Sequence, residues 1–65
     1  MKPEVVKVHS ALIVLHAAGG ELAAVARKVN GGEEWAVRTA TSPRVEFIAG
    51  EATVRARLAE IGGAR

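Results

Sequence analysis

Three Gly-Gly pairs punctuate this chain and restrict where its secondary structure can end. They are Gly19–Gly20, Gly31–Gly32 and Gly62–Gly63. Glycine adopts positive φ angles without steric cost, so it is favoured in turns and directly after helices. We therefore expect an element to end at each pair, within a single small domain that spans residues 1–65.

The length of the chain limits how much core it can build. A domain of about 60 residues buries only about 60% of the surface that its unfolded chain exposes, so such a domain is marginal on its own. Small domains commonly gain stability from disulfides, a metal or oligomerisation. This sequence has no Cys, and 13 of its apolar residues are Ala. We therefore expect no disulfide framework, little core volume and a homodimer.

Residues 3–18 are predicted to form a helix. Pro3 suits the first turn of a helix, and Gly19 suits the position that follows the last turn. Four apolar residues share one helical face, namely Val5, Val8, Leu12 and Leu15. The many β-branched residues favour a strand instead. A segment of about 14 residues without turn residues is long for a strand, however, so helix is the preferred reading.

Residues 21–29 are also predicted to form a helix. Their apolar residues repeat at the spacing of one helical face: Leu22, Val25, Ala26 and Val29. Glu21 lies near the expected N-terminus, where the helix dipole favours a negative charge. An alternative is that Asn30–Gly31 forms the turn of a β-hairpin that joins residues 22–29 to 34–41. The content of Ala and Leu favours the helix.

The second half of the sequence predicts a hairpin and a helix. Residues 34–41 and 44–49 alternate in polarity as strands do, and Ser42–Pro43 supplies a turn. Residues 51–61 form a helix whose apolar stripe is Val54, Leu58 and Ile61. We expect Gly62 to end this helix. The predicted fold class is α+β, in the order helix-helix-β-hairpin-helix. The alternative is an αβββα fold with a three-stranded antiparallel sheet.

Catalytic and metal-binding constellations are not recognisable in the sequence, so we expect no enzyme, no metal and no cofactor. His9 and His16 are seven residues apart, which is about 10 Å along a helix and too far for one zinc ion. Glu33 and Glu34 are adjacent, so in an extended segment they point to opposite faces. Neither Ser10 nor Ser42 has the surroundings of a catalytic nucleophile.

A protein-binding role is the preferred functional hypothesis. Trp35 and Phe47 are the largest aromatic residues, and aromatic side chains dominate both cores and interfaces. We predict that they contribute to a protein interface, with a place in the core as the alternative. The function predicted is a small non-enzymatic interaction module that regulates or inhibits another protein, whose identity the sequence does not give.

The alternative function is a DNA-binding transcriptional regulator that uses the helix of residues 51–61. Thr53, Arg55 and Arg57 could contact phosphates or bases. The net charge is only +2, and Arg55 and Arg57 lie about 200° apart around a helix, which is not one basic face. Nucleic acid is therefore the weaker prediction.

We predict a cytoplasmic protein that does not enter a membrane. The longest apolar run, residues 11–15, is far shorter than the roughly 20 residues of a spanning helix. The basic start and the apolar residues that follow imitate a secretory signal, but Lys7, His9 and Ser10 interrupt the apolar stretch.

Overall fold

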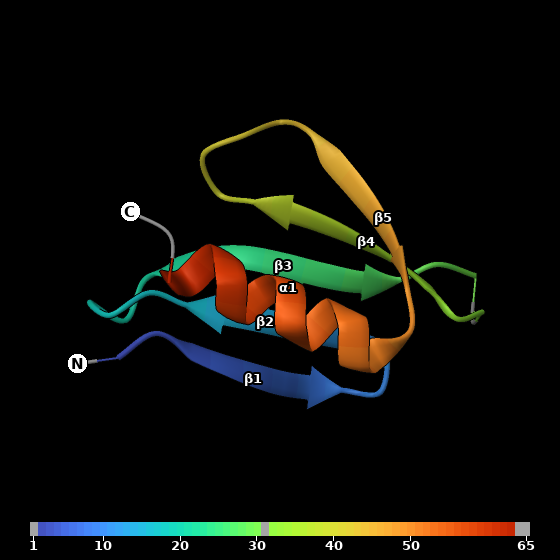
Figure 1. The fold of residues 1–65 in the computed structure, drawn as a ribbon, viewed down its shortest axis with the longest axis horizontal. Coiled ribbons are helices and arrows are strands. Elements are labelled where there is room, and N and C mark those ends of the chain that lie inside the picture. The colour runs from blue at the N-terminus through green and yellow to red at the C-terminus, as the bar shows by residue number, and fades with distance from the viewer. Residues whose placement is uncertain (1, 31, 64–65) are drawn as a thin grey trace.

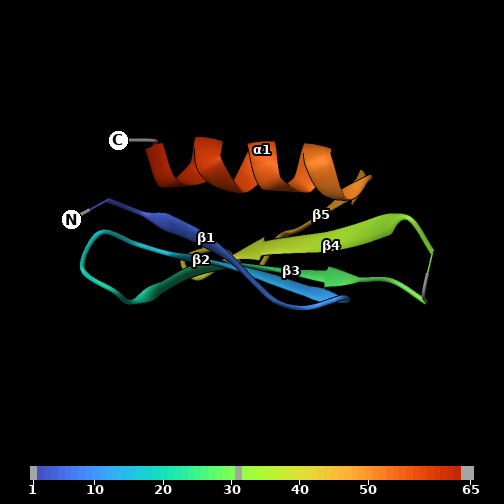
Figure 2. The ribbon, with the colours of Figure 1, turned by 90° about the horizontal axis from the view of Figure 1, so that it is seen from below.

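Each strand of this protein pairs with its neighbour in sequence. The computed structural model describes residues 2–30 and 32–63, which form one antiparallel sheet of order β1-β2-β3-β4-β5. The strands are β1 (Glu4–His9), β2 (Leu12–His16), β3 (Leu22–Lys28), β4 (Glu34–Thr39) and β5 (Val45–Ala49). The helix α1 (Glu51–Gly63) follows β5 and lies across one face of the sheet (Figures 1 and 2).

The predicted helix over residues 3–18 is wrong, because this segment forms the β1–β2 hairpin. The hairpin has a tight turn at Ser10 and Ala11, in which the Ala11 N–H donates to Nδ1 of His9 over 3.1 Å. Val8 is an extra residue in β1, since the residues on either side of it pair with consecutive residues of β2. A histidine and a bulge therefore make a turn that contains no glycine or proline.

The predicted helix over residues 21–29 is also wrong, which overturns the helix-helix-β-hairpin-helix order. The αβββα alternative is wrong too, because the β1–β2 hairpin replaces its first helix and the sheet has five strands. Leu22–Lys28 forms β3, the central strand of five. Ala24 and Ala26 are buried on one face, whereas Arg27 is exposed on the other. Apolar residues on both faces imitated a helical period. The hairpin alternative was correct, since β3 pairs with β4 and Asn30 has a φ of 49°; Gly31 lies outside the described residues.

The second predicted hairpin and the C-terminal helix are confirmed. The strands β4 and β5 pair, and the Ser42 hydroxyl accepts the Arg44 N–H over 3.2 Å in the connection. The helix continues through Gly62, so this residue does not end it. A Cβ atom at Gly62 would lie 3.1 Å from Cβ of Pro3 and 3.2 Å from Cδ1 of Leu15. Gly62 thus lets the helix approach β1 and β2 closely.

Gly50 separates β5 from α1 and starts the helix. Its φ of +92° is one that side-chain-bearing residues rarely adopt. The Gly50 carbonyl accepts the Val54 N–H over 3.1 Å, and the Gly50 N–H donates to the carbonyl of Glu33 over 2.8 Å. This one residue therefore turns the chain from the sheet edge onto the sheet face.

The core lies between α1 and the face of the sheet that it covers. It consists of eight buried residues: Ile13, Leu15, Ala24, Ala26, Trp35, Val37, Val54 and Leu58. The small side chains of Ala24 and Ala26 lie in the central strand, while Trp35 fills the space beside them. Among the residues that the structure describes, no helix is long and apolar enough to cross a membrane.

Candidate functional site

The helix covers only one face of the sheet, and the other face carries most of the remaining apolar side chains. Figure 2 shows α1 on one side of the strands, with no described element on the opposite side. We call that opposite side the open face. Its central residues are Val6, Leu12, Val14, Leu22, Val25, Arg27, Ala36, Arg38, Val45 and Phe47, with Glu4, His16, Glu34 and Ala49 at the strand ends.

The strand register places these residues in rows across the sheet. One row runs through Val6, Val14, Val25, Arg38 and Val45, one residue from each strand. The next row runs through Leu12, Arg27, Ala36 and Phe47. Because successive residues of a strand point to opposite faces, the positions between them face α1. The open face is therefore a continuous aliphatic surface with two arginines in it.

The open face is hollowed over β2, β3 and β4. A hollow of about 650 Å³ is lined by residues of all but the first strand, among them Leu12, Val14, Val25, Arg27 and Arg38. Val14 is only 8% exposed although no described element covers this face, because its neighbours in the row shield it. Leu22, Val45 and Phe47 remain 46%, 46% and 60% exposed.

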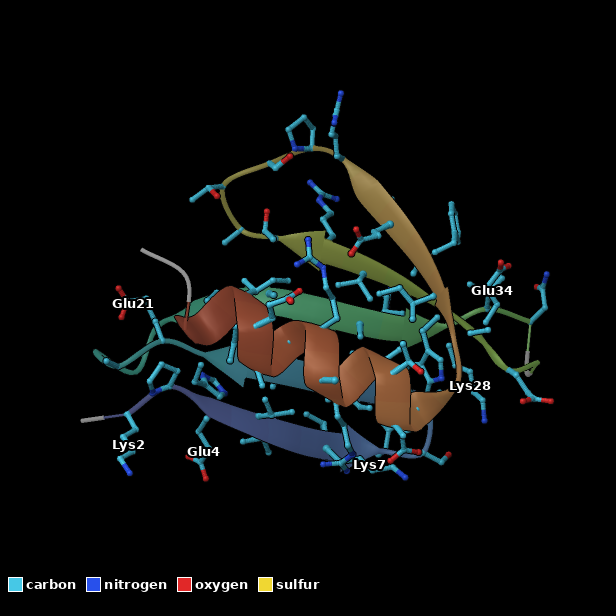
Figure 3. All side chains as sticks on the ribbon, viewed as in Figure 1. Lys2, Glu4, Lys7, Glu21, Lys28 and Glu34 are labelled. Carbon is cyan, nitrogen blue, oxygen red and sulfur yellow. The ribbon has the colours of Figure 1, made fainter. Side chains whose placement is uncertain are left out.

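The two arginines of the open face have no ionic partner among the described residues. Arg27 lies opposite Ala36, and Arg38 is two residues further along β4, so the two are diagonal neighbours on adjacent strands. The carboxylates on this face belong to Glu4 and Glu34, which Figure 3 shows at opposite ends of the molecule. Neither forms a salt bridge with an arginine in the described part of the chain.

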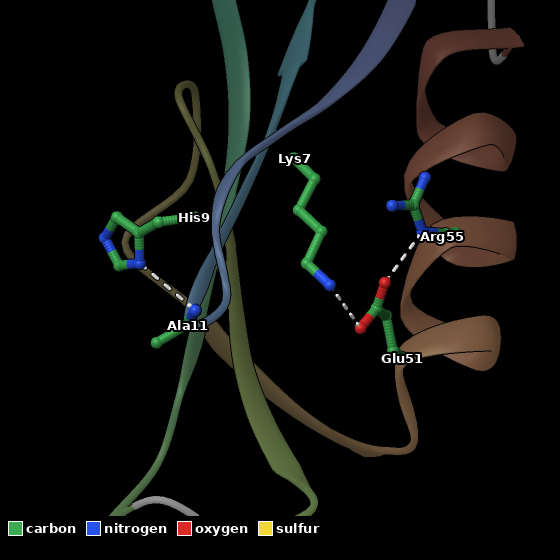
Figure 4. Close-up of polar contacts among 5 residues, drawn as sticks. All are labelled: Lys7, His9, Ala11, Glu51 and Arg55. Carbon is green, nitrogen blue, oxygen red and sulfur yellow. Dashed lines mark hydrogen bonds and ion pairs between the residues drawn. The ribbon is translucent and has the colours of Figure 1, made fainter.

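The charges on the helix side are paired instead. Figure 4 shows the Glu51 carboxylate between Lys7 of β1 and Arg55 of α1, each at 3.1 Å. The hydrogen bond from Lys7, followed by that from Arg55, lowers the pKa of Glu51 below its ordinary value of 4.5.

A second ion-pair cluster joins α1 to β5. The Arg57 guanidinium lies 2.8 Å from the Glu46 carboxylate and 2.7 Å from that of Glu60. The hydrogen bond to Glu46, then that to Glu60, raises the pKa of Arg57. The two clusters together engage three cations that would otherwise be free.

The structure separates the residues that the sequence suggested for a protein interface. Trp35 is 1% exposed and lies in the core, with Nζ of Lys28 5.7 Å from the centre of its ring. Phe47 lies on the open face of β5. Participation of either in an interface stays a prediction. The sequence does not predict the aliphatic residues of the open face as a surface, because three of their strands, β1, β2 and β3, fall in the two segments predicted as helices.

The residues proposed for DNA contact lie on α1 but not on one side of it. Arg55 contacts Glu51 near β1, whereas Arg57 contacts Glu46 of β5. Thr53 is exposed. The two guanidiniums therefore face opposite flanks of the helix, and each already has a carboxylate partner.

The histidines lie at separate turns of the sheet. Nδ1 of His9 accepts the Ala11 N–H, and Nδ1 of His16 donates to the Gly20 carbonyl over 3.2 Å. Over residues 2–30 and 32–63, no three His, Cys, Asp or Glu side chains gather in a way that could hold a metal ion. Each imidazole orders the backbone of a turn next to it.

Comparison with known proteins gives no relative. No family model matches the chain, and neither a curated protein nor a solved structure matches it.

Proposed function

We propose that this chain is a small non-enzymatic protein-binding module whose open face binds an apolar, acidic surface of another protein. The observation that carries the proposal is the position of Arg27 and Arg38 in an aliphatic face, where neither has an ionic partner among residues 2–30 and 32–63. A contiguous apolar patch on a small protein marks an interaction site more often than a plain surface. The module would regulate or inhibit the protein it binds, in the cytoplasm.

The chemistry of the partner follows from the spacing of the two arginines. The backbones of diagonal neighbours on adjacent strands lie about 7–8 Å apart, so Arg27 and Arg38 present two positive charges close together on the same face. A partner that places one carboxylate on each would neutralise both charges and form charge-assisted hydrogen bonds. Its remaining contact surface would be aliphatic, to match the row of Val14 and Val25.

The open face supports this role better than the outer side of α1 supports DNA binding. Phosphate groups would have to compete with Glu46, Glu51 and Glu60 for Arg55 and Arg57. On the open face, the arginines have no such competitors among the described residues. DNA binding therefore remains the second proposal.

Site-specific photo-crosslinking in the source cells tests the binding face. A photoreactive residue at position 22 reports on the open face, and one at position 59 reports on the exposed side of α1 as the matched control. We expect one protein to crosslink at position 22 but not at position 59. The double variant Arg27→Glu/Arg38→Glu should abolish this product, whereas Arg55→Glu should leave it unchanged.

Three results would contradict the proposal: equal crosslinking at both positions, no product at either position, or a product that survives the charge reversal. A fluorescent DNA duplex at about 50 mM salt checks the second proposal, since binding through several phosphates weakens steeply as salt rises. We expect no binding. Binding that Arg55→Ala/Arg57→Ala removes would favour the DNA-binding function instead.

A further inference from the structure

The two edges of the sheet differ in how they are protected from pairing with another strand. Natural edge strands carry bulges, lysines or prolines that prevent such pairing. The strand β1 has all three devices: a bulge at Val8, an inward-pointing lysine at Lys7 and Pro3 directly before it. This edge is therefore closed to a further strand.

The strand β5 is less protected than β1: it has no bulge and no lysine, its nearest proline is Pro43, two residues before it, and its one inward-pointing charge is Glu46. Its five residues pair with β4 in an unbroken register, and they include no Lys and no Pro. Its only charge, Glu46, is held by Arg57 at 2.8 Å. Phe47 at its centre is 60% exposed, more than any other large hydrophobic residue among those described. The strand thus offers a free backbone edge and an uncovered aromatic ring.

We propose that two copies of this chain pair through β5, antiparallel and with the two-fold axis at Phe47. The sheets of both copies would then join into one sheet of ten strands. In this register Phe47 lies opposite Phe47 of the second copy, Val45 opposite Ala49, and Glu46 opposite Ile48. An aromatic cross-strand pair then forms on the open side, where both rings lose their exposure.

The register follows from charge and from the ends of the strand. Centring the pair on Glu46 would place two carboxylates directly opposite each other, which is destabilising. Centring it on Ile48 would require pairing by Gly50, where the φ of +92° turns the chain away from the sheet. Only the register centred on Phe47 uses all five residues without a like-charge pair.

Pairing of two open faces is a poorer way to form the same dimer. It would bury Arg27 and Arg38 of both copies in one interface, and the open face offers carboxylates only at Glu4 and Glu34, at its two ends. The inference builds on the homodimer expected from the length of the chain. It does not depend on what binds the open face.

Disulfide trapping tests the pairing and its register, because the sequence contains no Cys and each variant then has a single thiol per chain. In Phe47→Cys, the two thiols face each other at a cross-strand distance that permits a disulfide. In Val45→Cys, the two thiols are about 13 Å apart along the strand, which is too far. Val8→Cys on β1 is the control for random collision.

We expect Phe47→Cys to oxidise to a covalent dimer at least about tenfold faster than either of the other two variants, given the geometry that a disulfide requires. A mixture of Val45→Cys and Ala49→Cys proteins should crosslink to each other, and this arm leaves Phe47 in place if its replacement impairs folding. Light scattering on the native protein should give twice the 6.8 kDa of one chain.

A mass of 6.8 kDa at about 100 µM, a concentration well above that needed for a dimer of ordinary affinity, would overturn the inference. A dimer in which neither Phe47→Cys nor the mixture outpaces Val8→Cys would also overturn it. The variant Arg27→Glu/Arg38→Glu should remain dimeric. Loss of partner binding and loss of dimerisation are therefore separate results.

Discussion

At the scale of the residue, the carboxylate of Glu51 connects three points of the fold. It stands in the first turn of α1, where the helix dipole favours a negative charge, and it binds Lys7 of β1 and Arg55 of α1. The cation from β1 ties the first strand to the last element. This link lies at the surface, so its contribution depends on pH and salt more than that of the core does.

The lowered pKa of Glu51 fixes the sign of this pH dependence. The carboxylate is more acidic in the folded chain than in the unfolded one, so its contribution to stability is present above its ordinary pKa of 4.5 and is lost as the pH falls through the folded value. The variant Glu51→Gln should therefore lose less stability than the native protein between about pH 7 and pH 3. Urea unfolding across this range measures it, with Glu21→Gln as the control. Equal slopes for Glu51→Gln and the native protein would contradict the assignment.

Gly62 and Gly63 form a matched pair for testing close packing. Both lie in α1, but a side chain at Gly62 meets Pro3 and Leu15, whereas one at Gly63 meets nothing within 4 Å. We expect Gly62→Leu to lower the free energy of unfolding by about 1–3 kcal/mol through overpacking. Gly63→Leu should change it by less than about 0.5 kcal/mol, as exposed positions usually do. Denaturant unfolding measures both, and equal effects would show that the helix does not approach β1 and β2 this closely.

At the scale of the element, α1, which is the only helix among the described residues, supplies two of the eight core residues and covers the other six. Val54 and Leu58 are fully buried against the sheet, and Ile61 packs beside them. The strands contribute two alanines directly beneath it, so the larger helix side chains fill the space that the alanines leave. Truncation of a buried side chain of α1 therefore leaves a space that the two alanines of the sheet do not fill.

Leu58→Ala tests this dependence. Truncation of a buried leucine costs about 2–5 kcal/mol. Domains of this size have only about 3–5 kcal/mol in all. The variant should therefore be largely unfolded at room temperature, which far-ultraviolet circular dichroism would show. Thr53→Ala on the exposed side of α1 is the control. A cooperative transition for Leu58→Ala close to that of the control would mean that α1 is not part of the core.

The elements differ in how far the sequence could predict them. The hairpin β4–β5 is predictable because Ser42–Pro43 marks a turn and the polarity alternates on both sides of it. The helix α1 is predictable from the apolar stripe of Val54, Leu58 and Ile61. The hairpin β1–β2 was missed because its turn uses His9 and a bulge, neither of which has a sequence signature. The strand β3 was missed because alanine is a good helix former, and tertiary packing under α1 overrides that preference.

The candidate site was harder to predict than the fold, for a related reason. The sequence draws attention to Phe47, since an aromatic residue is conspicuous in any sequence, and its role in an interface stays a prediction. Arg27 and Arg38 become neighbours only once β3 and β4 are paired in the observed register. A helix over residues 21–29 would have placed Arg27 in the last turn of that helix, away from the second arginine.

At the scale of the whole molecule, the proposed dimer ties stability to concentration. Any association of folded chains that excludes the unfolded chain stabilises the fold by mass action. The melting temperature should therefore rise as the protein is concentrated from about 1 µM to about 100 µM, and a variant that cannot pair through β5, such as Phe47→Lys, should lose this rise. Differential scanning fluorimetry and circular dichroism cover the two ends of the range. A melting temperature independent of concentration in the native protein would contradict the dimer.

The neighbour-to-neighbour order of the strands also has a kinetic consequence. Each strand finds its partner across a short connection, so the sheet requires little loop closure and its hairpins can form one after another as the chain is synthesised. The buried face of that sheet, however, has no cover until α1 has left the ribosome. Docking of α1 should then come late, after the transition state for folding, so substitutions at Val54 or Leu58 should accelerate unfolding more than they slow folding.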